Sequence, residues 1–335
     1  MRILHFSSGS GSTSIPFMWF KKQMETGVDV GFYGLADSGK GRVARCLHGL
    51  KFIKREEFDV LHVHHALPAA LAVLSRWLFL SRKPFVISLH RSFHHLGPGA
   101  KVCHVLAFMV SKKIIANSLA TKDTLPRIFK GKAEVVYNGT AVGFWSSPNV
   151  LDKKKSLNIL FVGRFVKEKN IFSLVAALKS VSAIVAIKAD FLGAGPLFNN
   201  VAKFIDEMNV SDCISVHGEV GRAEVAEFMS SADCLIVPSL TEGYCNVAVE
   251  AMSLGLPVIY TPAPALIEVV NGNGWCCSGF GSEDIAAQIL SFHQEDGDRI
   301  KTRSEKAWSM VKREMSIDAS IDRFSQIYQE VTSND

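Results

Sequence analysis

The sequence predicts an α/β protein built from two doubly wound parallel-sheet domains in tandem. Short runs rich in β-branched and aromatic residues alternate with helical patterns, which is typical of parallel sheets covered by helices on both faces. The alternation stops near residues 142–158 and then restarts. At 335 residues, the chain is also long enough for two domains that each bury a sizeable core.

The first half alternates predicted strands with helical patterns. One helical pattern covers residues 15–27, where Gly27 can cap the C-terminus of the helix. Another covers residues 67–80, LPAALAVLSRWLFL. The predicted strands are residues 2–6, 28–33, 59–64, 84–90, 113–117 and 133–138.

The segment 142–158 differs in composition from its surroundings. It contains Pro, Ser and a Lys run, so we expect an inter-domain linker there. The strands predicted after it are residues 158–163, 183–193, 213–218, 233–239 and 257–261. We therefore expect one domain over residues 1–145, a second over 157–315, and a C-terminal helix over 316–335 that packs back toward the first domain. Ligands of such sheets bind beyond the carboxyl ends of the strands. The carboxyl edges of the two sheets are expected to face each other across a cleft.

Composition favours a soluble globular protein, with 48% hydrophobic and 21% charged residues. The longest apolar run, residues 66–80, is interrupted by Arg76 and is too short to span a bilayer comfortably. The first residues lack the pattern of a secretory signal. Seven cysteines without a C-x-x-C pair are expected to be reduced thiols, which favours a cytoplasmic protein.

The charge is unevenly distributed along the chain. Residues 1–150 carry 20 Lys and Arg against 8 Asp and Glu, a net charge of +12. Residues 151–335 carry 17 against 24, a net charge of −7, and the two values give the +5 of the whole chain. Two halves this different indicate two domains that face different partners.

Two loops after predicted strands of the second half could bind a phosphate group. In GRFVKEKN, Arg164 and Lys169 lie near the start of a helix, where they could clamp a diphosphate or simply be solvated. In FLGAGPL, Gly193 and Gly195 allow close backbone approach to a ligand, although a plain turn is equally consistent with these residues.

The stretch TEGYCNVAVEAMSLGLPVIY places two carboxylates, Glu242 and Glu250, around an apolar helical pattern. Burying a carboxylate there is costly unless a partner compensates it. Eight residues at a helical rise of 1.5 Å span about 12 Å. From the residues alone, a carboxylate buried with a local partner is the simpler interpretation.

These elements together resemble the retaining glycosyltransferases of family 4, which have the GT-B fold of two Rossmann-like domains. The resemblance is carried by E-x7-E at Glu242–Glu250, by the following run at Ala251–Val258, and by GRFVKEK and FLGAGPL. It covers residues 158–260 well and the first half less closely. In the first half, LHVHH, SLH, ANS and VVYNGT fall where that family has similar segments.

The resemblance implies a role for each site residue. It implies that the first domain binds a glycan or lipid-linked acceptor and that the second binds a nucleotide-sugar donor, UDP- or GDP-linked. Glu242 would face the sugar hydroxyls and Glu250 the ribose, while Arg164 and Lys169 would stabilise the leaving diphosphate. His90 matches a position near the reacting centre, with a backbone-bonded histidine as the alternative. The remaining expected donor-binding residues are Gly193, Gly243, Tyr244, Cys245, Asn246 and Val247, the last four through free amides at a helix start.

No cofactor and no metal are expected. Arg164, Lys169 and the helix amides supply the positive charge that a cation would otherwise provide, and no Asp-x-Asp pattern is expected to hold one. His62 and His64 share a strand face, but no carboxylate or cysteine stands near them in sequence to complete a ligand set. The loop SSGSGSTS, residues 7–14, lacks both the G-x-G-x-x-G and the G-K-[ST] signatures.

The activity implied is metal-independent, retaining transfer of a sugar in bacterial-type surface polysaccharide or lipopolysaccharide synthesis. A nucleotide-sugar epimerase and a non-catalytic nucleotide-sugar or polysaccharide-binding module are the alternatives. E-x7-E favours transfer over epimerisation, and a diphosphate clamp favours catalysis over binding alone. The missing glycine fingerprint disfavours a dehydrogenase.

The basic first half predicts peripheral association with the inner face of the cytoplasmic membrane, since each Lys or Arg near an anionic leaflet contributes about 1 kcal/mol of attraction. Aromatic residues Phe17, Trp19 and Phe20 are expected to be exposed among these charges. No nucleic-acid partner is expected, because no known nucleic-acid module is present. The basic clusters are residues 21–22, 40–45, 51–55, 81–83, 112–113 and 130–132.

Overall fold

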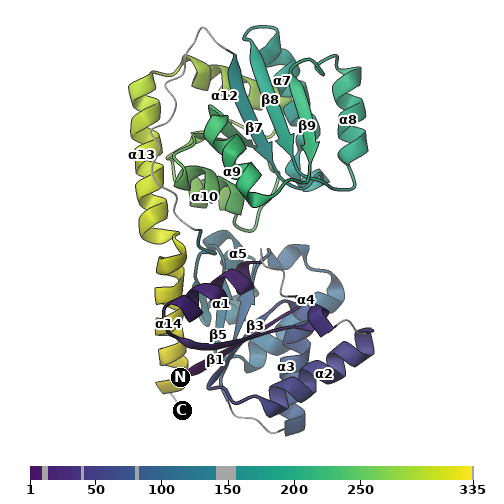
Figure 1. The fold of residues 1–335 in the computed structure, drawn as a ribbon, viewed down its shortest axis with the longest axis vertical. Helices are drawn as coiled ribbons and strands as arrows, with labels where there is room; N and C mark the ends of the chain where they lie inside the picture. Colours follow the sequence, from purple (N-terminus) through teal and green to yellow (C-terminus); the bar gives the residue numbers. More distant parts are fainter. Residues whose placement is uncertain (10–13, 39–40, 80–82, 141–155, 334–335) are drawn as a thin grey trace. The chain divides into compact units, whose positions relative to one another are not determined.

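The computed structural model describes residues 1–9, 14–38, 41–79, 83–140 and 156–333. The chain forms two compact units, one of Met1–Gly139 with Ile317–Asp335 and the other of Thr140–Ser316. Each unit contains a six-stranded parallel sheet with flanking helices (Figure 1). The predicted α/β class with two doubly wound domains is confirmed. Residues 142–155 of the predicted linker lie outside the described residues. So do residues 10–13 of the loop 7–14 and residues 81–82 of the basic cluster 81–83.

The sheet of the first unit has the strand order β2-β1-β3-β4-β5-β6, and all its neighbouring strands pair in parallel. All six strands predicted in the first half are present. They are β1 (Arg2–Ser7), β2 (Asp29–Gly34), β3 (Val60–His64), β4 (Phe85–Leu89), β5 (Lys113–Ala116) and β6 (Ala133–Val135).

Helices cover both faces of this sheet because side chains of successive strand residues point to opposite sides. Leu4 and Phe6 of β1 belong to a core under helices α2 to α4, whereas Ile3 belongs to a second core under helices α1 and α14. The C-terminal helix α14 thus packs within the first unit. The helices are α1 (Ile15–Glu25), α2 (Arg42–Arg55), α3 (Ala66–Phe79), α4 (Pro98–Val110), α5 (Leu119–Asp123), α6 (Arg127–Lys130) and α14 (Ile317–Ser333), with 3₁₀ turns at Leu35–Ser38 and Phe93–His95.

Helix α1 shows how the sequence sets the ends of an element. Pro16 lies in its first turn, where a missing amide hydrogen costs nothing. Gly27 follows the helix with a φ of +79°, and its amide donates to the carbonyl of Met24, so the predicted capping glycine is confirmed. Trp19, expected to be exposed, is only 1% exposed, because its indole packs in the core and donates to the carbonyl of Asn138.

The sheet of the second unit has the order β12-β11-β10-β7-β8-β9. Its strands are β7 (Leu157–Val162), β8 (Ile187–Leu192), β9 (Ile214–Gly218), β10 (Cys234–Val237), β11 (Val258–Tyr260) and β12 (Trp275–Cys276). Its helices are α7 (Ile171–Ser182), α8 (Phe198–Glu207), α9 (Arg222–Ser231), α10 (Asn246–Ser253), α11 (Pro264–Val270), α12 (Ser282–Gln294) and α13 (Gly297–Glu314), with a 3₁₀ turn, η3, at Lys167–Lys169.

The second sheet differs from the prediction in two details, one wrong boundary and one missed strand. The strand expected from residue 183 begins only at Ile187, because Ala183 still caps helix α7. The short strand β12 was not predicted, since two residues are too few to produce a periodic pattern. Among the described residues, no helix is long and apolar enough to cross a membrane.

Candidate active site

The candidate site of the second unit lies at the carboxyl edge of its sheet, where the strand order reverses. Strand β7 lies between β10 and β8. After β7 the polypeptide adds β8 and β9 on one side of it, and then β10, β11 and β12 on the other. Loops at such a switch point diverge and leave a crevice, which is where open parallel sheets bind ligands. The loops after β7 and β10 carry Lys169 and Glu242, two of the residues predicted from sequence.

Lys169 and Glu242 are in direct contact. Lys169 Nζ lies 2.5 Å from Glu242 Oε1, and both side chains are mostly buried, with 19% and 12% exposed. Ser239 Oγ donates to the same carboxylate oxygen at 2.7 Å. The Leu240 amide donates to the carbonyl of Glu168 at 2.8 Å, which fixes the loop after β10 against the 3₁₀ turn η3. The carboxylate inside the apolar stretch is therefore compensated by an ammonium and a hydroxyl.

The charge of Lys169 is maintained in spite of burial. Burial disfavours the ammonium form, but the neighbouring Cys245 and Glu242 outweigh it and raise the pKa of Lys169. Arg164 lies near enough to oppose this shift by repulsion, and its own side chain is exposed. The loop after β7 therefore carries two cations that repel each other, an arrangement that favours binding of a multiply charged anion.

The glycines of FLGAGPL let two loops pack together. A Cβ atom on Gly193, whose φ is +134°, would lie 2.0 Å from the Gly163 carbonyl oxygen. A Cβ atom on Gly195, whose φ is +158°, would lie 2.6 Å from the carbonyl oxygen of Phe165. The close approach that these glycines permit is thus to the loop after β7. This contact holds the segment that carries Arg164 and Lys169.

Helix α10 begins later than predicted. It starts at Asn246, and Cys245 precedes it in the left-handed conformation with a φ of +73°. The distance of about 12 Å expected between Glu242 and Glu250 assumed an unbroken helix, and it does not apply, since residues 242–245 are not helical. Asn246 and Val247 occupy the first turn of the helix. Tyr244 and Cys245 are buried at its start.

Glu250 lies within α10 and is separated from Glu242 by the first turn of the helix. Burial raises the pKa of Glu250, and the nearby charge of Arg222 opposes that shift. Cys245 is buried beside Lys169, and burial raises the pKa of its thiol to about 12, so it is a structural thiol and not a nucleophile.

His90 belongs to the first unit and follows strand β4. Its ring lies against Trp19, with ring centroids 5.7 Å apart, and its Nε2 lies 3.2 Å from His64 Nδ1. The Asn117 side chain donates to the His90 carbonyl at 3.2 Å. Burial, followed by the charges of His65 and His104, lowers the pKa of His90 from 6.5 to about 3. His90 is therefore neutral at physiological pH.

Sequence reasoning missed several neighbours of these residues. Ser239 binds Glu242, and a polar residue two positions after the end of β10 was the signal that could have identified it. His64, which contacts His90, was considered only as a metal ligand. The expectation that the sequence contains no Asp-x-Asp pattern to hold a cation was wrong, because residues 296–298 are Asp-Gly-Asp. Here Asp296 accepts from the amides of Asp298 and Arg299 and caps helix α13.

Comparison with known proteins gives the family. Residues 144–307 match the model of the group 1 glycosyl transferases, and residues 24–143 match the model of glycosyltransferase family 4. The chain therefore belongs to the family 4 glycosyltransferases, as the resemblance predicted.

The relatives found by sequence are distant but extend over much of the chain. An uncharacterized glycosyltransferase of Methanocaldococcus jannaschii is 29% identical over 85% of this chain and 79% of its own. The N-acetyl-alpha-D-glucosaminyl L-malate synthase of Bacillus anthracis is 23% identical over 84% of this chain and 77% of its own. TuaC of Bacillus subtilis, a putative teichuronic acid biosynthesis glycosyltransferase, is 28% identical over 63% of this chain and 56% of its own.

Solved structures confirm the GT-B fold. The crystal structure of Anabaena HepE in complex with UDP and glucose has a TM-score of 0.79 to this chain at 17% identity, with 98% of this chain and 100% of that one covered.

Proposed function

We propose that this glycosyltransferase transfers a sugar from a nucleotide-sugar donor, with retention of configuration and without a metal ion, to a polysaccharide or lipid-linked acceptor. The contact between Lys169 and Glu242 at the switch point of the second sheet carries the proposal. It brings together a buried cation for a diphosphate and a carboxylate for sugar hydroxyls.

The chemistry requires stabilisation of the charge that develops as the anomeric C–O bond breaks. Arg164 and Lys169, with the amides that begin α10, are donors positioned for a departing diphosphate. Glu242 accepts from Lys169 and Ser239, and its second oxygen remains as an acceptor for a donor-sugar hydroxyl. Glu250, which lies within α10, is assigned to the ribose of the nucleotide. His90 is assigned to the donor sugar.

The acceptor is proposed from relatives and from the surface of the first unit. A teichuronic acid enzyme among the relatives supports a surface polysaccharide. Another relative is an N-acetyl-alpha-D-glucosaminyl L-malate synthase, so a small hydroxy acid is the alternative acceptor to test.

A purified sample incubated with a panel of UDP- and GDP-sugars tests the donor assignment. One donor is expected to raise the melting temperature well above the others, because a ligand stabilises the state that binds it. With that donor and an acceptor extract, proton NMR of the product should show the anomeric configuration of the donor, and EDTA should leave most of the rate. An inverted product, or full loss of activity that magnesium or manganese restores, would reject retention or metal independence respectively.

We further propose that the first unit binds anionic membranes through the outer faces of α2, α3 and α4. Helix α3 packs between the other two, and its Trp77 is 76% exposed. Exposed apolar side chains continue across the three helices, while Lys51 and Lys54 are exposed on α2. Apolar residues flanked by basic ones suit the interface of an anionic bilayer. The exposed apolar residues are Val43, Leu47, Leu67, Leu74, Trp77, Leu78, Val102, Leu106 and Met109.

Vesicle co-sedimentation tests this surface. Trp77→Ser with Leu78→Ser should reduce binding to anionic vesicles, and Lys51→Gln with Lys54→Gln should reduce both binding and its sensitivity to salt. Ile184→Ser, a control in the second unit at a residue 69% exposed, should bind like the wild type. Equal binding of all variants to neutral and anionic vesicles would reject the proposal.

A further inference from the structure

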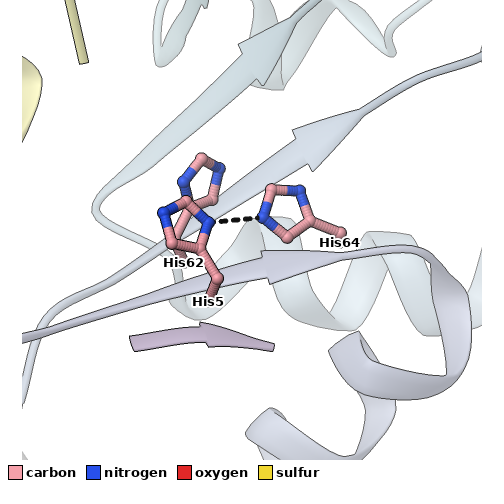
Figure 2. Close-up of side chains that lie close together, drawn as sticks. All are labelled: His5, His62 and His64. Carbon is pink, nitrogen blue, oxygen red and sulfur yellow. Dashed lines mark hydrogen bonds between the residues drawn. The ribbon is translucent and has the colours of Figure 1, made fainter. Parts of the chain in front are cut away.

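A cluster of buried histidines fills the space between the first sheet and helices α1 and α14. The side-chain alternation of the strands places it there, since His5 of β1 pairs with His62 of β3, and His64 pairs with Ser88 of β4, so that all four face the same side. The side chains of His5, His62 and His64 are fully buried and lie close together (Figure 2).

Every ring nitrogen of these three histidines lies within hydrogen-bond distance of a partner. His62 binds two hydroxyl groups, with Nδ1 at 2.6 Å from Tyr328 and Nε2 at 2.7 Å from Ser88. His5 and His64 form a chain of hydrogen bonds that leads from Gln23 to His90. It runs from Gln23 Oε1 to His5 Nε2 (2.7 Å), from His5 Nδ1 to His64 Nε2 (3.0 Å), and from His64 Nδ1 to His90 Nε2 (3.2 Å).

A cation is the competing explanation for such a cluster. One ligand atom from each of the three rings lies within 4.8 Å of the others, which is a spacing that could hold a metal ion. A metal takes the lone pair of a nitrogen and would displace the hydrogen bond that the nitrogen makes. Since all six nitrogens are engaged with hydrogen-bond partners, the geometry is that of a hydrogen-bonded chain.

The hydrogen-bonded chain runs in one direction from donor to acceptor, and Gln23 sets that direction. An amide oxygen can only accept, so His5 must carry its proton on Nε2. A neutral imidazole has a single N–H, so His5 Nδ1 accepts from His64 Nε2–H. By the same rule, His64 Nδ1 accepts from the Nε2–H of His90. This leaves the Nδ1 of His90 without a proton.

Burial keeps the members of the chain neutral, as this argument requires. Burial lowers the pKa of His5 to about 4, although the hydrogen bond to Gln23 opposes the shift. Burial, with repulsion from the other histidines, also lowers the pKa values of His62 and His64 well below 6.5. Each ring of the hydrogen-bonded chain then carries a single N–H at neutral pH. It therefore donates through one nitrogen and accepts through the other, as the assigned direction requires.

We propose that Gln23 is a positioning residue that, through His5 and His64, holds His90 in the Nε2–H tautomer with an unprotonated Nδ1. His90 is the partly exposed end of the chain, one residue beyond β4. A substrate hydroxyl that binds this nitrogen must therefore donate its hydrogen, and His90 serves as a hydrogen-bond acceptor and not as an acid. The use of this tautomer in catalysis rests on the assignment of His90 to the donor sugar.

Nitrogen NMR of protein labelled at histidine measures the tautomers directly. In the wild type at neutral pH, His90 should show a protonated Nε2 and a bare Nδ1, and the His90→Gln spectrum identifies its signals. Gln23→Met keeps the size of the side chain but removes the amide acceptor, so His90 should become a mixture of tautomers. Ser88→Ala is the matched control, because it removes a hydrogen bond of His62 without touching the chain.

The outcomes separate the proposal from its alternatives. A protonated Nδ1 on His90 in the wild type, or a tautomer that Gln23→Met leaves unchanged, would overturn it. So would a stoichiometric metal ion in the purified protein together with loss of the N–H signals of His5 and His64. If Gln23→Met fails to fold, the wild-type spectrum alone still decides the tautomer.

Activity then tests whether the tautomer matters. Gln23→Met should lower kcat about tenfold, the size expected for one lost hydrogen bond, while affinity for the nucleoside diphosphate stays unchanged. If His90 shows the expected tautomer but the protein transfers no sugar, the proposed function is wrong. The hydrogen-bonded chain that sets the tautomer would still be supported. An altered tautomer with an unchanged kcat would overturn the catalytic part of the inference.

Discussion

Lys169 Nζ and Glu242 Oε1 lie 2.5 Å apart although 73 residues separate them in the chain. The pair joins the loop after β7 to the loop after β10, the two loops that flank the switch point of the second sheet. Because both side chains are largely buried, removing one partner leaves an uncompensated charge. The pair is therefore expected to contribute to the stability of the unit as well as to its chemistry.

Arg164 and Lys169 should differ in their effect on stability. Arg164→Ala and Lys169→Ala should each lower kcat roughly 10²–10³-fold, as is typical for loss of one donor to a developing charge. Arg164 is exposed, so its removal should leave the melting temperature unchanged, whereas Lys169→Ala should lower it. Lys169→Ala combined with Glu242→Gln should restore stability but not activity. Steady-state kinetics and thermal melts provide the measurements, and near-normal kcat in both single variants would contradict the clamp.

Glu242 and Glu250 should separate in a binding experiment. Glu250→Ala should weaken binding of the free nucleoside diphosphate, because its partner would be the ribose. Glu242→Ala should largely preserve that binding and reduce transfer, since the product lacks the sugar. Titration calorimetry with UDP and GDP measures the first effect, and the opposite pattern would mean that the two roles are reversed.

Gly193→Ala should destabilise the second unit. The new Cβ atom would lie 2.0 Å from the Gly163 carbonyl oxygen, in a backbone conformation with a φ of +134° that side chains disfavour. We expect a loss of at least about 2 kcal/mol in the free energy of unfolding. Gly297→Ala is the control, because a Cβ atom there has no neighbour within 4 Å. Urea denaturation compares the two, and equal stabilities would show that the loop contact is dispensable.

The stability of the protein should fall as pH decreases from about 6.5 to 4. Burial lowers the pKa values of His5 to about 4 and of His90 to about 3, and it also lowers those of His62 and His64. The unfolded chain therefore binds more protons than the folded one in this range, and each histidine adds up to about 1.4 kcal/mol per pH unit to the slope.

Urea denaturation at a series of pH values measures this slope. His62→Gln removes one of these histidines. It should therefore reduce the slope of the unfolding free energy against pH by up to about 1.4 kcal/mol per pH unit. A stability that is flat between pH 6.5 and 5 would contradict the burial of neutral histidines.

The strands and the donor-binding loops could be predicted because their patterns are local. Near-continuous apolar runs identified β7 and β10, and the residues directly after them identified Arg164, Lys169 and Glu242 as candidates. The start of α10 could not be predicted, since Cys245 adopts a left-handed conformation that nothing in its neighbours requires. Trp19 was wrongly expected on the surface, because its position beside two lysines gives no indication of the core that helix α14 completes.

The sequence alone determined the fold class and the residues that face each side of a strand, because side-chain alternation depends only on the backbone. It thus placed His62 and His64 on one face. Only the tertiary structure decided what those rings do. The partners of His64 come from β1 and from the residue after β4, and the amide that directs the chain comes from α1. Hydrogen bonds between residues distant in sequence depend on strand order and register, which pairing of the whole sheet establishes and no local pattern encodes.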